Sequence, residues 1–132
     1  MIVSTDVQTI LYKAAHKLGI LNVYKDGTEP EGEVKSERIV IIVNSIGTGI
    51  YWKSGFAYVN ICIPYKDRKG TKNLERLNVV ERLACKVMNS TSEFDNTPYT
   101  YEVESHGVEE DKDLKCHYVS VRILFRVLNV KE

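Results

Sequence analysis

The sequence predicts one α+β domain in which two helices pack on a mainly antiparallel sheet of about four strands, in the order helix, hairpin, helix, hairpin. Apolar residues recur at helical spacing in two segments and alternate with polar residues in several others. The chain has 132 residues, of which 43% are hydrophobic and 27% are charged, an ordinary composition for a globular protein. Because two cores in so short a chain would each bury little apolar surface, residues 1–132 are expected to form a single domain.

The two predicted helices have apolar residues three and four positions apart, which places them on one face. The first helix is expected from Val7 to Leu18, with a Thr5–Gln8 capping box at its start and Gly19 at its end. The second is expected from Leu74 to Met88, with most of its charged residues turned away from the sheet. Both helices are therefore predicted to cover the same sheet.

The first predicted hairpin begins with the aliphatic strand Arg38–Ile46. Gly47–Gly49 interrupts this strand, and Phe56–Ile63 resumes the extended pattern before a proline closes it. Asn22–Lys25 can add a short extended piece. The segment that follows, from Asp26 to about Val34, is expected to form a surface loop.

The second predicted hairpin lies in the last third of the chain. Asn89–Asn96 is polar and is expected to form turns, after which Tyr99–Ser105 alternates as a strand. Gly107 and the acidic run Glu109–Asp111 are expected to form a solvated turn. Val119–Val127 then alternates strictly and is the clearest strand in the sequence.

Charge and hydropathy argue against two classes of partner. Lysine plus arginine total 18, as do aspartate plus glutamate, so no net positive charge attracts nucleic acid or an anionic membrane. The longest aliphatic stretch, Ile39–Val43, is far shorter than the roughly 20 apolar residues of a membrane-spanning helix. The first residues lack the features of a secretion signal, and the cysteines, Cys62, Cys85 and Cys116, are interpreted as packed or free thiols in a reducing compartment.

No catalytic, cofactor-binding or metal-binding site is predicted from the reactive residues. His16 lies in a helix, and Cys116 and His117 are neighbours whose side chains should point to opposite faces of a strand. Gly47–Gly49 lacks the lysine and following helix of a phosphate-binding loop, and Glu109–Asp113 lacks the spaced oxygen ligands of a calcium loop. A non-enzymatic protein is therefore the main expectation.

One chemical alternative stays open at this stage. Glu102 and Glu104 share a strand face, and the last hairpin could bring both close to His106 and His117. Such a cluster would suit a small ligand-binding or enzymatic α+β domain.

Two sets of residues are candidates for a protein interface. The first surrounds the only tryptophan, because aromatic residues commonly anchor interfaces, although Trp52 could equally fold back onto the core. The second is the face of the last strand opposite its core residues, which mixes leucines with arginines. The candidate interface residues are Ile50, Tyr51, Trp52, Lys53, Phe56, Tyr118, Arg122, Leu124 and Arg126.

The order of these segments resembles bacteriophage tail completion and tail terminator proteins. The resemblance spans most of the chain and is carried by Val7–Leu18, Val23–Pro30, Phe56–Pro64, the helix that follows, Tyr99–Ser105 and His117–Phe125. It implies a structural subunit without an active site or cofactor, which forms a homo-oligomeric ring that is often hexameric. Its implied partners are tail tube and neck proteins, and its implied location is the virion tail after assembly in the host cytoplasm. A head-tail connector of the neck is the alternative that shares this assembly logic.

Overall fold

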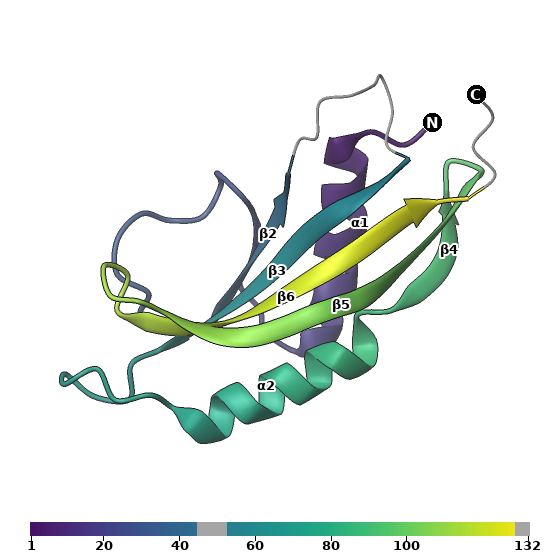
Figure 1. Cartoon of the computed structure of the whole chain (residues 1–132). Helices are drawn as coiled ribbons and strands as arrows, with labels where there is room; N and C mark the ends of the chain where they lie inside the picture. The colour runs from purple at the N-terminus through teal and green to yellow at the C-terminus, as the bar shows by residue number, and fades with distance from the viewer. Residues whose placement is uncertain (45–52, 129–132) are drawn as a thin grey trace.

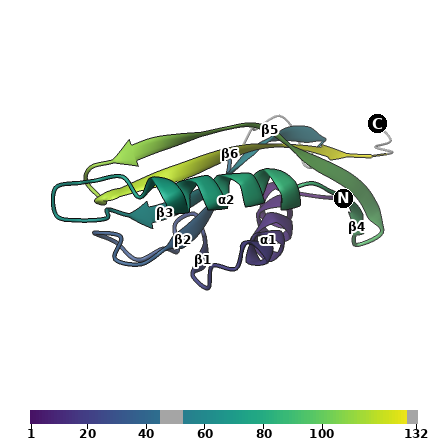
Figure 2. The same ribbon diagram turned by 90° about the horizontal axis from the view of Figure 1, so that it is seen from below.

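In the computed structural model, which describes residues 1–44 and 53–128, two helices lie on one side of a curved six-stranded sheet (Figure 1). The view from below shows that both edges of the sheet bend toward the helices (Figure 2). In chain order the elements are α1 (Ser4–Ala15), the 3-10 helix η1 (His16–Leu18), β1 (Val23–Lys25), β2 (Arg38–Val43), β3 (Ser54–Pro64), α2 (Leu74–Val87), β4 (Ser90–Phe94), β5 (Thr97–Asp111) and β6 (Cys116–Val127).

The sheet corrects the expected fold class. Its strand order is β1-β2-β3-β6-β5-β4, and β1 pairs with β2 in parallel while the other four pairings are antiparallel. The prediction of a mainly antiparallel sheet of four strands under two helices was therefore wrong, because the sheet is mixed and has an additional strand at each edge. The antiparallel pairing of β2 with β3 and of β5 with β6 is confirmed.

The two additional strands carry weak hydrophobic signals. β1 is only three residues long and is defined by its parallel pairing with Ile39–Ile41. β4 contains mostly polar residues, and it forms because Asp95 and Asn96, with φ angles of 50° and 64°, make a tight turn that leads directly into β5. Turns with two positive φ angles match the twist of a hairpin, so turn chemistry decides this strand.

β5 continues beyond the point where its end was predicted. The expected turn at Gly107 and Glu109–Asp111 is instead strand, and the chain reverses after Asp111 to return in β6. The reason is that Cys116–Tyr118 of β6 needs backbone partners, and these acidic residues supply them while their side chains remain largely in water. A bulge between Val103 and Ser105 shifts the register within this long pair.

The hydrophobic core lies between the helices and the concave face of the sheet. Val119, Val121, Ile123 and Phe125 of β6 are all 0% exposed, which confirms the alternation predicted for this strand. Val7, Leu11, Leu77 and Val80 of the helices pack in the same core. Tyr99, Tyr101 and Phe125 add a stack of three rings, with centroids 5.1–6.1 Å apart.

The helix ends differ slightly from those expected. α1 begins at Ser4 and not at Val7, and the Thr5–Gln8 capping box was wrong, because the carboxylate of Asp6 accepts a hydrogen bond of 2.9 Å from the amide of Val3. Gly19 ends η1 with a φ of 75°, as predicted. α2 is capped by Asn73, whose side chain accepts a hydrogen bond of 3.4 Å from the amide of Arg76.

Replacing Asn96 with valine should lower the free energy of unfolding by about 1–2 kcal/mol, because a β-branched residue is strained at this positive φ. Urea denaturation measures the change. The matched control is Glu93→Val on β4, which places the same side chain on exposed extended backbone and should change stability by less than about 0.5 kcal/mol. Equal stability of the two variants would show that the turn does not hold β4 in place.

Candidate functional site

The convex face of the sheet, which we call the outer face, carries most of the predicted interface residues that the structure describes. Phe56 pairs with Leu124 across β3 and β6, Tyr58 pairs with Arg122, and Cys62 pairs with Tyr118. These side chains alternate with the core residues and therefore point away from the helices. Arg126 lies opposite Ser54 at the end of the same ladder.

The remaining predicted interface residues belong to the connection before β3. Lys53 is exposed, and its carbonyl accepts a hydrogen bond of 2.7 Å from the amide of Val127. Ile50, Tyr51 and Trp52 lie outside the described residues. The structure thus gathers Phe56, Tyr118, Arg122, Leu124 and Arg126 on one sheet face.

Arg122 is held at the centre of the outer face by two contacts. Its guanidinium carbon lies 3.7 Å from the ring centroid of Phe56, and its Nε lies 3.3 Å from a carboxylate oxygen of Glu104. The second contact is an ion pair that lacks the alignment of a hydrogen bond, so this Nε has no hydrogen-bond partner. A cation over an aromatic ring contributes about 0.5–1 kcal/mol at an exposed site, which helps to fix the position of the guanidinium.

At one end of the outer face, the segment between β1 and β2 covers a small pocket. The amide of Val34 in this segment donates to the carbonyl of Leu114 over 2.8 Å, and the guanidinium of Arg38 donates to the carbonyl of Pro30 over 3.0 Å. The pocket has a volume of about 180 Å³ and contains Arg38, Cys62 and Cys116 in its lining. All three cysteines are free thiols, and Cys62 and Cys116 are buried.

The residues of the enzymatic alternative are not brought together. Glu104 pairs with Arg122, while Nδ1 of His106 lies 2.7 Å from a carboxylate oxygen of Glu81 on α2. His117 is 5% exposed and lies at another position along the sheet, opposite Glu110 of β5. The alternation of strand residues separates these groups, and the bulge in β5 adds to the separation.

A different cluster forms around His117. The hydroxyl of Tyr65 donates to a carboxylate oxygen of Glu110 over 2.7 Å, and Nε2 of His117 lies 3.8 Å from the same oxygen. The rings of Tyr65 and His117 have centroids 5.3 Å apart, and Nδ1 of His117 has no hydrogen-bond partner in the described structure. Sequence reasoning missed this cluster because Glu110 was assigned to a solvated turn and Tyr65 is far away in the chain.

The protonation of this cluster favours a structural role. The hydrogen bond to Glu110 raises the pKa of Tyr65 to about 12, and the same bond lowers the pKa of Glu110. Both shifts move away from neutral pH, whereas a general acid or base works best with a pKa close to the working pH. The Tyr65–Glu110 bond therefore acts as a clamp between the end of β3 and the last hairpin.

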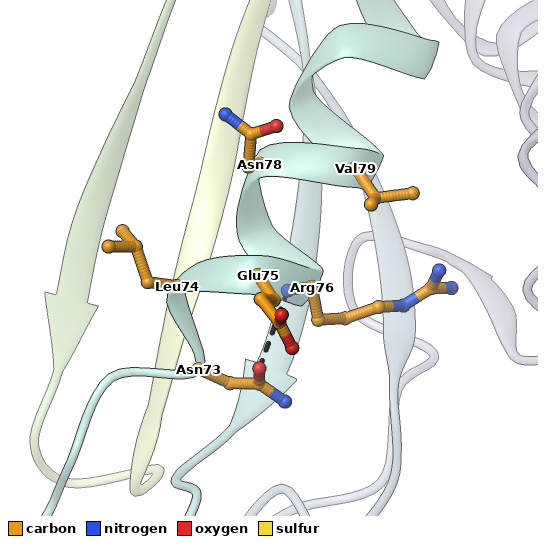
Figure 3. A pocket seen from close by; sticks show the side chains of 6 residues that line it. All are labelled: Asn73, Leu74, Glu75, Arg76, Asn78 and Val79. Carbon is orange, nitrogen blue, oxygen red and sulfur yellow. Dashed lines mark hydrogen bonds between the residues drawn. The ribbon is translucent and has the colours of Figure 1, made fainter.

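The hollow at the start of α2 is also unsuited to binding a small molecule. Its lining residues, Asn73, Leu74, Glu75, Arg76, Asn78 and Val79, all come from the first turns of one helix and its cap. Figure 3 shows that their side chains point in different directions around the helix and do not converge. Leu74 and Val79 are 68% and 52% exposed. This hollow is therefore an open stretch of helix surface.

Among residues 1–44 and 53–128, no three histidine, cysteine or acidic side chains are grouped to hold a metal ion. Neither described helix is long and apolar enough to cross a membrane.

Comparison of the chain with protein-family models, with curated proteins and with solved structures found no match.

Replacing Glu110 with glutamine should lower the pKa of Tyr65 from about 12 toward the ordinary value, because the phenol binds a neutral amide oxygen more weakly than a carboxylate, and the charge that opposes the phenolate is lost. Carbon NMR of ring-labelled tyrosine, assigned with a Tyr65→Phe variant, measures this titration. Glu109→Gln is the matched control, because Glu109 raises the pKa of Tyr118 and not that of Tyr65. If Tyr65 titrated identically in the Glu110→Gln variant and the unmodified protein, the clamp would be disproved.

Proposed function

We propose that this chain is a structural phage or prophage tail protein, which caps the tail tube and supports head-tail joining as a subunit of a homo-oligomeric ring. The proposal rests on the resemblance of the segment order to tail terminator proteins. The single structural observation that supports it is the outer face, which presents aromatic, leucine and arginine side chains without cover from either helix.

The outer face has the composition of an interface core with a polar rim. Phe56, Tyr58 and Leu124 are partly exposed near its centre, beside Arg122, and the exposed Arg126 lies at its border. Aromatic residues and arginines are enriched in protein interfaces and supply most of their binding energy. A face of this kind can bury its apolar atoms against a neighbouring subunit.

A ring subunit also needs a second surface, since each neighbour must contact a different side of it. β5 offers one, because β4 pairs only with Thr97–Tyr101. Along Glu102–Asp111, no described strand pairs with the edge of β5 that faces away from β6. The amide of Val103 on this edge donates instead to the side chain of Asn89 over 3.0 Å. An open strand edge can accept an extended segment of a neighbour through backbone hydrogen bonds.

The Leu124→Lys variant should weaken self-association at least about tenfold, because a charge buried in the contact costs more than 1.4 kcal/mol. Sedimentation and electron microscopy of the unmodified protein should show a closed ring, and the variant should sediment as smaller species. Binding of purified tail tube protein or of neck protein would distinguish a terminator from a neck connector.

The control for this test is Leu21→Lys, which makes the same change at a leucine that is 94% exposed and lies between η1 and β1, outside the β3–β6 ladder. It should leave the ring intact. A protein that remains monomeric at high concentration would contradict the assembly proposal. If only the Leu21→Lys variant lost the ring, the subunit contact would lie around Leu21 and not on the outer face.

A further inference from the structure

The pocket at the end of the outer face places a buried cation beside two thiols. Arg38 of β2 lies directly opposite Cys62 of β3 in the strand register. Cys116 of β6 lies opposite Pro64, so it is the diagonal neighbour of Cys62 on the same face. The exposed fractions of Arg38, Cys62 and Cys116 are 7%, 6% and 0%, and all three line the pocket.

Arg38 is incompletely compensated in this position. A terminal nitrogen donates a hydrogen bond of 3.0 Å to the carbonyl of Pro30, and the guanidinium also interacts with the sulfur of Cys62. Its buried Nε has no hydrogen-bond partner among the described residues. It also forms no ion pair with a described carboxylate. A buried charge without a counter-charge costs several kcal/mol, so an anion beside this guanidinium would be strongly favoured.

The register identifies Cys62 as the sulfur best placed to become that anion, because it lies across from Arg38 whereas Cys116 lies further along the sheet. A hydrogen bond from Cys116 lowers the pKa of the Cys62 thiol, and the positive charge of Arg38 lowers it further, although burial opposes both. The same hydrogen bond and burial raise the pKa of Cys116. Cys116 therefore acts as the donor that stabilises a Cys62 thiolate.

The other charged residues that line the pocket are acidic. Asp111 of β5 opposes a negative sulfur at Cys62. Asp26 and Glu29, in the segment after β1, also line the pocket, as does the neutral phenol of Tyr118 on β6. Arg38 is the only positively charged residue in this lining, so its removal should shift the balance toward the neutral thiol.

We propose that Cys62 is a reactive thiolate that is modified by small uncharged electrophiles, of which hydrogen peroxide is the simplest biological example. The thiolate attacks one peroxide oxygen, the oxygen–oxygen bond breaks, and the products are a sulfenic acid on Cys62 and hydroxide, which becomes water by taking a proton from a buffer acid in the solvent. A pocket of about 180 Å³ admits molecules of this size. This site goes beyond the assembly role and does not depend on it.

A disulfide between Cys62 and Cys116 is not the expected first product. Diagonal neighbours in antiparallel strands have Cα atoms about 7–8 Å apart. A disulfide needs a separation below about 7 Å, so the two strands would have to shift before it could form. The sulfenic acid should therefore persist long enough to be trapped.

Iodoacetamide labelling of the folded protein, followed by mass spectrometry of each cysteine, tests the proposal. At pH 6 Cys62 should react at least about tenfold faster than Cys85, whose pKa is raised by burial. The pH dependence of the Cys62 rate should have its inflection below the ordinary thiol value of about 8.5. Prior treatment with hydrogen peroxide should block the labelling of Cys62, and a thiol reductant should restore it.

Arg38→Met removes the cation and should slow labelling of Cys62 at least about tenfold while the Cys85 rate stays the same, which also reports that the fold is intact. If this variant fails to fold, the pH profile of the unmodified protein still decides the question. An inflection at or above the ordinary thiol value, or labelling of Cys62 only after denaturation, would overturn the proposal.

Discussion

The long antiparallel ladder between β3 and β6 is the interaction on which the rest of the structure depends. Ser54–Pro64 pairs with Cys116–Arg126 without interruption at the centre of the sheet, although the two segments are far apart in the chain. The inward residues of both strands, such as Val59 and Val121, are 0% exposed. Because side chains alternate, a slip of one residue would expose this core and bury Tyr58 and Arg122 in its place. The hydrophobic effect therefore specifies a single register.

The same register organises both surfaces that we interpret functionally. Once Val59 and Val121 face the helices, Phe56 and Leu124 must face outward together, and Cys62 faces outward with them. The adjoining register of β2 with β3 then places Arg38 beside Cys62. The interface residues and the thiol pocket thus lie on the same face of the sheet. Both face outward because the alternate residues of these strands are buried in the core. A change that disturbed the ladder would alter both, whereas a substitution on the outer face can alter one alone.

Sequence patterns predicted the elements that hydrophobic burial decides. The helical faces around Leu11 and Leu77 and the alternation along β6 were visible because each follows a strict period. β4 and the end of β5 were missed because backbone pairing and turn geometry, and not apolar side chains, hold them. Polar strands of this kind have no clear hydrophobic period to detect.

The same distinction applies to the candidate site. The outward residues Tyr118, Arg122 and Leu124 could be assigned to one face from the alternation of β6 alone. The pairing of Arg38 with Cys62 could not, because it depends on a register between strands that the sequence does not encode locally. Similarly, the contact of Glu110 with Tyr65 could not be predicted, because it depends on β5 extending to Asp111. The acidic residues at this end of β5 had indicated a turn.

The acidic character of the uncovered part of β5 has a consequence for the free subunit. Unpaired strand edges tend to form backbone hydrogen bonds with the edges of other chains. Charged residues along an edge commonly protect a protein against such aggregation. Glu102, Glu104 and Glu109 are exposed there, so two copies that approached through this edge would repel each other. This repulsion weakens as ionic strength rises. The edge is consequently better suited to pairing with a segment that carries basic residues than with the same edge of a second copy.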